Sequence, residues 1–211
     1  TEEERRTFTG RSKGLHYGDL NPIQEGVPHI HKITPVVSSR LPLKKADRDY
    51  TGMVEGVFES YMDIQNYEID RGRFLASSDV AEFKKVVVLG NEISEKLFGV
   101  EDPIGQDIKM GLQRFIVVGR LAEKGALHGI NYDMTVVIPA TTMMKLFSGN
   151  DELTSLVVRI DQRKNMAAAS DSIRTILMRR HDNVEDFSIR SQDQLVRNIE
   201  MIIFTFQVIL S

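Results

Sequence analysis

A stretch punctuated by glycines, residues 85–125, constrains the fold more than any other part of the chain. It opens with an all-apolar run at 86–89, and Asn91 is then expected to act as the N-cap of a helix that Gly99 ends. Asp-Pro and glycine predict a turn after this helix. The apolar residues that follow predict two strands joined at a Gly-Leu pair, at residues 108–110 and 115–121.

The composition sets limits on function. With 211 residues and 41% hydrophobic residues, the chain is long enough for one or two packed domains. A net charge of −3 provides no basic field for nucleic acid, and the absence of cysteine excludes disulfides and zinc sites built on thiolates. The phosphate-binding loop, the dinucleotide fingerprint, the nucleophile elbow and the HExxH motif are all missing from the sequence.

The N-terminal third predicts a short helix capped by Asp19, followed by extended chain. Residues 33–37 alternate as a strand with one wet face, and the prolines at 35 and 42 favour an edge strand or a loop. Further along, the sequence predicts a hairpin link at 44–52, a strand at 53–58, a turn or short helix at 61–67, and a loop at 77–81.

The C-terminal third alternates strands and helices. We expect a strand at 134–138, a helix capped by Thr141 and closed by Gly149, and a strand in which residues 156, 158 and 160 share a face. The clearest helical period covers 163–180, and a final strand is expected at 187–189. The layout indicates an α+β chain whose middle is inserted between strand–helix units from both ends.

A capping box at residues 191–194 predicts one more helix, which becomes almost entirely apolar over 199–211. A membrane span needs about 20 apolar residues, and this run reaches the last residue without a stop signal. We interpret it as the start of a truncated transmembrane helix; a buried core helix is the alternative. No signal peptide is visible at the N-terminus.

No group of residues converges into a catalytic, cofactor or metal site, and we predict none. His29 and His31 could share a strand face but lack further metal ligands nearby, and Glu101-Asp102 is expected to be a solvated pair. Arg71 and Arg73 are expected to pair with Asp70 or Asp79. Met143, Met144 and Phe147 are expected to be core residues, and Asp161, Arg163 and Lys164 ordinary surface charges.

The order of these signals resembles the extracytoplasmic core domain of MacB-like ABC-transporter permeases. The resemblance rests on VVVLG, KLFG, DPIGQDI and FIVVGRL in that order, with Gly56-Val57, Gly72-Arg73-Phe74 and Asp79 upstream, and it covers residues 27 to the end. It implies a porter-like α/β lobe from both chain ends (1–57 and 136–198), an inserted β-rich, Sabre-like lobe (58–135), and the start of a second membrane helix (199–211).

The resemblance also implies the function. This domain would stand on the outer side of the cytoplasmic membrane and couple ATP hydrolysis, carried out by a separate domain or subunit, to efflux or to work on envelope proteins. Its expected partners are the ABC ATPase, a periplasmic adaptor, a second permease copy and, through flanking helices, the membrane. The chain itself would not be an enzyme.

Three other functions stay open at this point. The domain could belong to a lipoprotein-release permease, or it could be a membrane-anchored sensor that binds a small ligand in one apolar pocket. An envelope enzyme or metal protein would need a paired acid and base or a metal cluster, which the sequence does not present.

Overall fold

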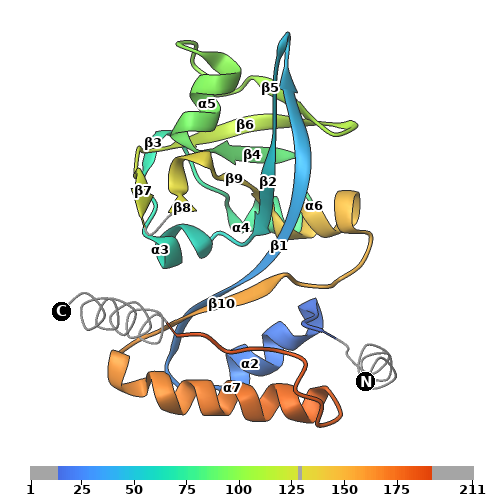
Figure 1. The fold of residues 1–211 in the computed structure, drawn as a ribbon, viewed down its shortest axis with the longest axis vertical. Coiled ribbons are helices and arrows are strands. Elements are labelled where there is room, and N and C mark those ends of the chain that lie inside the picture. The colour runs from blue at the N-terminus through green and yellow to red at the C-terminus, as the bar shows by residue number, and fades with distance from the viewer. Residues whose placement is uncertain (1–13, 128–129, 192–211) are drawn as a thin grey trace, which may run out of the picture.

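The computed structural model describes residues 14–127 and 130–191, which form a mixed α+β fold (Figure 1). The strands are β1 (Ile30–Lys45), β2 (Arg48–Val57), β3 (Ile69–Gly72), β4 (Val86–Leu89), β5 (Asp107–Met110), β6 (Gln113–Leu121), β7 (Ala126–Leu127), β8 (Ile130–Asn131), β9 (Val136–Pro139) and β10 (Ser155–Ile160). The helical segments are η1 (Tyr17–Asp19), α2 (Leu20–Gly26), α3 (Tyr61–Gln65), α4 (Ser77–Ala81), α5 (Asn91–Phe98), η2 (Tyr132–Met134), α6 (Ala140–Met143), η3 (Met144–Ser148), η4 (Arg163–Asn165) and α7 (Met166–Arg180).

Six strands close into a mixed barrel. β1 pairs with β2, β2 with β9, β9 with β4, β4 with β6 and β6 with β5, and β5 returns to β1 at Leu43 and Lys44. The β2–β9 and β4–β6 pairs are parallel, whereas the other four are antiparallel. Closure removes most of the open edges that an unclosed sheet would expose.

Every second side chain along these strands points into the barrel and fills its interior. The residues that point inward are fully buried in one apolar cluster: Leu43, Val54, Val87, Leu89, Ile108, Met110, Phe115, Val117, Val136 and Ile138. Their neighbours Val86, Val88 and Val137 point to the other side and join a second cluster with Tyr61 and Tyr67. The period of two therefore places one face of each strand in the barrel and the other under α3 and β3.

Two helices complete the barrel core. Ile93, Leu97 and Phe98 of α5 and Met143 of α6 belong to the same cluster as the barrel interior. Gly56 of β2 is needed for the approach of α6, because a Cβ at that position would lie 2.4 Å from Cβ of Met143. The prediction that Met143, Met144 and Phe147 pack in the core is confirmed.

The predicted strand–helix–turn–hairpin unit at 85–125 is confirmed as β4, α5, β5 and β6. One detail was wrong: Gly90 is the N-cap, and Asn91 is the first helical residue, with its side chain donating to Glu95 at 3.2 Å. Helix ends commonly shift by one residue in this way.

β1 is the longest strand and runs through both halves of the molecule (Figure 1). It pairs with β10 over Ile30–Val36 and with β2 from Val37 onward. Pro35 and Pro42 both lie where β1 has a register partner on one side only, which agrees with the predicted edge character around the prolines. The hairpin link is confirmed but tighter than predicted, with the turn at Ala46 and Asp47.

A third cluster lies below the barrel in Figure 1 and joins α2, α7, β10 and the start of β1. Leu156, Val158 and Ile160 face it together, as their alternation predicted, and it also contains Ile23 and Leu177. The predicted helix at 163–180 is confirmed as η4 followed by α7.

Three predicted local features were wrong. Residues 77–81 form α4 instead of a loop, because Asp79 accepts the backbone N–H of Ala76 and so caps a one-turn helix. Thr141 lies inside α6, which begins after Pro139, and its hydroxyl donates to the carbonyl of Val80. Residues 187–189 form no strand, and Phe187 instead packs edge-on against the ring of His181.

The predicted capping box at 191–194 and the apolar run at 199–211 lie outside the described residues, apart from Ser191. Among the helices that the structure describes, none is long and apolar enough to cross a membrane.

Candidate functional site at the junction of the chain ends

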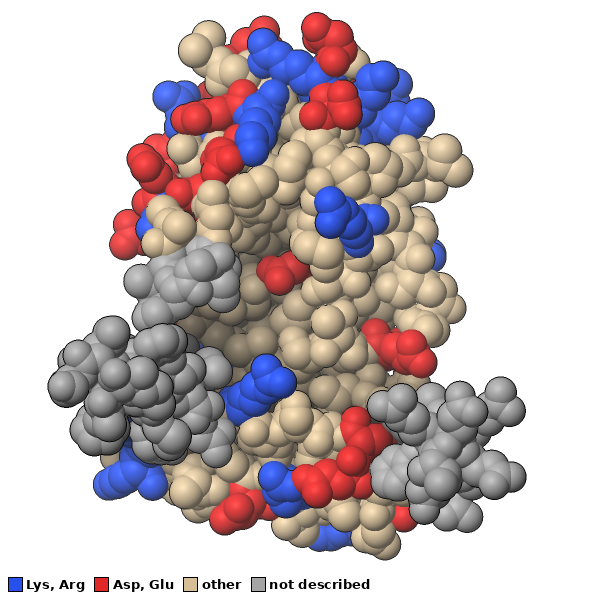
Figure 2. Space-filling view, viewed as in Figure 1, with Lys and Arg blue, Asp and Glu red and all other residues tan. Residues whose placement is uncertain are grey.

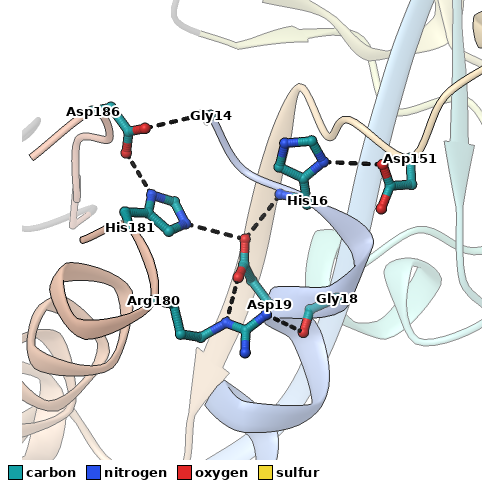
Figure 3. Close-up of polar contacts among 8 residues, drawn as sticks. All are labelled: Gly14, His16, Gly18, Asp19, Asp151, Arg180, His181 and Asp186. Carbon is teal, nitrogen blue, oxygen red and sulfur yellow. Dashed lines mark hydrogen bonds and ion pairs between the residues drawn. The ribbon is translucent and has the colours of Figure 1, made fainter. Parts of the chain in front are cut away.

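A buried polar cluster joins the first described residues to the segment after α7 (Figure 3). We call it the junction and define it by Gly14, Asp19, Arg180, His181 and Asp186. Its central pair is 162 positions apart in the sequence, with Nε2 of His181 lying 3.3 Å from Oδ2 of Asp19. The backbone N–H of Gly14 donates to Oδ2 of Asp186 at 2.9 Å.

Local sequence positions the N-terminal half of the junction. Asp19 ends η1, and its Oδ2 accepts the backbone N–H of His16 at 2.9 Å, so that the carboxylate folds back over its own turn. The side chain of His16 points the other way, to Asp151 at 3.0 Å (Figure 3). α2 then follows and packs against α7.

A reversal after α7 positions the C-terminal half. His181 follows the last residue of α7, and its N–H still bonds to the carbonyl of Leu177. Asp182 and Asn183 then adopt φ values of 55° and 61°, a left-handed conformation that these two residue types tolerate better than most. The turn brings Asp186 back to Nδ1 of His181 at 2.5 Å.

The junction is buried and charged. Asp19 and His181 are each 3% exposed. Both ring nitrogens of His181 lie within hydrogen-bonding distance of a carboxylate, Nδ1 near Asp186 and Nε2 near Asp19. Nε of Arg180 donates to Oδ1 of Asp19 at 2.6 Å, so a guanidinium pairs with the buried carboxylate.

Burial would raise the pKa of Asp19, but hydrogen bonds from Arg180, from the His16 backbone and from His181 together hold that pKa below its usual value. The ionised carboxylate is therefore the native form, held by donors from both ends of the described chain. Breaking one partner of such a buried set leaves an unpaired charge, which costs about 3–5 kcal/mol. The arrangement is suited to holding two segments together.

The sequence-derived candidate residues do not converge. His29 precedes β1 and lies 3.2 Å from Asp161, whereas His31 is exposed within β1. Within the described residues, no group of three potential metal ligands occurs. The expected arginine pairing is confirmed for Arg73, which donates to Asp79 at 2.5 Å.

Arg71 forms the expected ion pair with Asp70 at 4.0 Å and a closer one with Asp102 at 3.1 Å. Asp102 also accepts the backbone N–H of Ile104 across its turn, so it is a structural carboxylate at the surface rather than half of an acid pair with Glu101.

A recess of about 380 Å³ lies between α3 and the paired strands β1 and β10. Its lining is polar: His31, Lys32, Asp63, Asn66, Tyr67, Glu68 and Arg159. Lys32 forms an ion pair with Asp63, and Arg159 donates to the carbonyl of Asp63 at 2.9 Å. Internal pairing and an exposed lining give this recess little of the apolar character of a small-molecule site.

Sequence reasoning missed the junction. Asp19 was predicted only as a helix cap, and His181 follows the predicted helix at 163–180 without a distinguishing motif. What marks these residues as a site is that two carboxylates contact one imidazole, and that contact exists only in the tertiary fold.

Comparisons with known proteins agree with the fold. A family model described as the MacB-like periplasmic core domain matches residues 3–176. The macrolide export ATP-binding/permease protein MacB of Vibrio parahaemolyticus is 30% identical over 203 residues, which cover 96% of this chain and 31% of that protein. Its namesake in Pectobacterium atrosepticum is 30% identical over 88% of this chain and 28% of its own length.

Solved structures show the same arrangement. The periplasmic region of MacB from Actinobacillus actinomycetemcomitans superposes with a TM-score of 0.79 at 25% identity, over 90% of this chain and 84% of that one. The extracellular domain of the transporter YknZ from Gram-positive bacteria shares the fold, with a TM-score of 0.75 at 19% identity over 87% and 93% of the two chains.

This chain spans less than a third of the length of these two curated relatives, whose names combine ATP binding with permease function. The six-stranded barrel, the matched family and the superposition point to one conclusion: the chain belongs to the family of MacB-like periplasmic core domains, the periplasmic part of a MacB-type ABC-transporter permease.

Proposed function

We propose that this domain transmits mechanical work from a cytoplasmic ATPase to efflux, or to a partner protein in the envelope. It would do so as part of a permease in the cytoplasmic membrane, and it would itself hydrolyse no ATP. The observation that carries the proposal is the junction, where Gly14 bonds to Asp186 and Asp19 to His181. Segments near both chain ends are thereby held in one packed unit.

The path from the junction to the barrel is short. α2 and α7 share an apolar cluster with β10 and the start of β1, and β1 continues without a break into the barrel. A displacement of either chain end would therefore turn α2 and α7 together and pass into the barrel through one continuous strand. Packed units that move as rigid bodies relay small shifts in this way.

We also propose a two-lobed division into a porter-like lobe and an inserted β-rich lobe. The predicted boundaries were 1–57, 58–135 and 136–198. The apolar clusters favour boundaries closer to the ends of the chain. Val37 and Leu153 pack with the barrel, Ile33 and Val158 pack with α2 and α7, and Leu156 between them contacts both clusters. In this proposal β2 and β9 belong to the barrel lobe.

The proposed partners follow from the same role. They are an ABC ATPase domain or subunit, a second permease copy, the membrane through flanking helices, and a periplasmic adaptor protein. A lipoprotein-release role would use the same coupling with a different cargo. A sensor role would instead require a small molecule to bind the recess beside Lys32 and Asp63, and titration of the chain with candidate ligands distinguishes the two.

The test uses the full-length transporter in liposomes. Asp19→Asn combined with His181→Ala should leave ATPase activity within about twofold of wild type and reduce transport about tenfold or more, since the work no longer reaches the barrel. A matched control, Arg73→Gln with Asp79→Asn, breaks an ion pair in the barrel half whose carboxylate is buried, and it should spare coupling. Equal loss of transport in both variants would refute the proposal.

An engineered cross-link tests the opposite change, because it holds the junction closed instead of weakening it. The described chain contains no cysteine, so Gly14→Cys with Asp186→Cys introduces one defined pair. If the two segments move as one unit, oxidising this pair should preserve transport. Loss of transport on oxidation that reduction restores would show that the junction must open, and would overturn the proposal.

A further inference from the structure

Three cations stand opposite one another on the outer wall of the barrel. Lys44 of β1 is the register partner of Lys109 on β5, and Lys109 is the register partner of Arg114 on β6. Their chain neighbours Leu43, Met110 and Phe115 are fully buried in the barrel. Because side chains alternate along a strand, the three cations share the outer face, and all three are exposed.

This row works against the stability of the sheet. Like charges directly opposite each other on antiparallel strands destabilise the pair. Arg114 is compensated by Asp107 at 2.6 Å. Lys44 and Lys109 form no ion pair with any residue in the described part of the chain. Asp49 is the β2 register partner of Lys44, but the two side chains do not form an ion pair. An acidic residue at position 109 could form ion pairs with both Lys44 and Arg114, yet a lysine is present.

Apolar side chains border the row. Leu112, at the turn between β5 and β6, is 90% exposed, and Ile116, two residues beyond Arg114, is 44% exposed. Lys85 adds a cation at the rim next to Ile116, whose N–H donates to the Lys85 carbonyl, and Nζ of Lys85 donates to Oε1 of Gln113 at 2.8 Å. Figure 2 shows lysine and arginine interspersed with acidic side chains at the upper end of the molecule.

We propose that this wall, defined by Lys44, Lys85, Lys109, Arg114, Leu112 and Ile116, docks an acidic segment of another protein that also carries apolar side chains. Neighbouring strands lie about 5 Å apart, so Lys44, Lys109 and Arg114 span about 10 Å across three strands. That width matches an extended or helical segment better than one small anion. The exposed leucine and isoleucine give such a segment apolar contact that a purely ionic partner would not use.

The proposal does not rest on mechanical coupling, since a docking wall would serve a transporter or a sensor equally. It makes a linked prediction about stability and binding. Lys109→Glu places an acid between two cations, so it should raise the melting temperature of the isolated chain by about 2–4 °C while weakening the docking of an acidic partner. If Lys109 had a purely structural role, its replacement would not raise the melting temperature and weaken binding at the same time.

The experiment uses the purified chain and two probes, a random glutamate–leucine copolymer and poly-L-glutamate, with binding followed by fluorescence anisotropy at low and physiological salt. Lys85→Glu with Lys109→Glu should weaken copolymer binding about tenfold, and more salt should weaken the wild type in the same direction. Leu112→Ser should weaken binding of the copolymer but not of poly-L-glutamate.

A charge-matched control is Lys164→Glu with Arg179→Glu, on the α7 side of the molecule, which should bind as wild type does. The proposal is overturned if the wild type binds neither probe, or if the control loses binding equally. It is also overturned if phosphatidylglycerol vesicles bind more tightly than the copolymer and lose binding with the same wall variants, because the wall would then recognise lipid.

Discussion

The phenol of Tyr61 donates a hydrogen bond of 2.8 Å to Oε2 of Glu55 on the outer side of the barrel. Burial raises the pKa of Glu55, and this hydrogen bond offsets only part of the effect. A carboxyl group whose pKa is raised by folding stabilises the native state below its unfolded pKa, and that contribution is lost as pH rises through the folded pKa. Ionised Glu55 therefore destabilises the domain at neutral pH.

Glu55→Gln should accordingly raise the melting temperature at pH 7, by about 2–4 °C, because the amide still accepts from Tyr61 without a buried charge. At pH 4, where the native carboxyl is protonated, the two proteins should melt at similar temperatures. Thermal unfolding followed by circular dichroism at both pH values measures this, and a variant that is less stable at pH 7 would contradict it.

The contribution of Asp79 to stability should have the opposite pH dependence to that of Glu55. Burial acts to raise its pKa, but hydrogen bonds from Arg73 and from the Ala76 backbone leave that pKa below the usual value. Its contribution is present above the unfolded pKa of about 3.9 and is lost as pH falls through the folded value. We expect Asp79→Asn to cost about 1–3 kcal/mol at pH 7.

The check for Asp79 is urea unfolding as a function of pH. The difference between wild type and Asp79→Asn should shrink as the medium becomes acidic. Asp47→Asn, in the exposed turn between β1 and β2, is the control and should follow wild type throughout. A difference that stays constant down to acidic pH would mean that the carboxylate charge is not what stabilises this helix cap.

Gly56 should tolerate no side chain. Its added Cβ would meet Cβ of Met143 at 2.4 Å and the backbone of Ala140 at 3.1 Å, so α6 would have to move. We expect Gly56→Ala to cost about 1–3 kcal/mol in the free energy of unfolding. Gly26→Ala is the comparison, because its nearest neighbour is the flexible end of Ile176 at 2.9 Å, and it should cost less. A reversed order would be inconsistent with the packing described.

The junction makes a prediction about local opening. Asp19→Asn removes the charge that His181 and Arg180 share, so residues 14–19 and 181–186 should separate at a lower free energy than global unfolding. Hydrogen exchange should then speed up at Gly14 and in the reversal after α7, while the barrel strands stay protected. Uniformly faster exchange would indicate that the junction is not a separate cooperative unit.

How far the sequence predicts this fold depends on how local its signals are. β4, α5, β5 and β6 could be predicted because glycine and proline divide residues 85–125 at short intervals. Barrel closure could not, since it depends on Leu43 pairing with Met110, which lies far along the chain and has no matching motif. α4 was missed because a five-residue helix has too little period to detect.

The candidate site was less predictable than the fold. The arginine pairing of Arg73 followed from nearby acidic residues, but Asp19 and His181 each had an adequate local explanation. Only the packing of α2 against α7 brings them together. The cation row likewise appears only once the register of β1, β5 and β6 is known, because Lys44 and Lys109 show no relation in the sequence.

A strand shared by two packed layers restricts how those layers can move. β1 is held by β10 up to Val36 and by β2 from Val37, so sliding one layer past the other would tear a whole ladder of backbone hydrogen bonds. Bending at Val36 and Val37 keeps both ladders and strains the bonds that join α3 to the lower layer, such as those from Lys32 and Arg159 to Asp63. The two layers should therefore flex slightly about this point of β1 but not slide past one another.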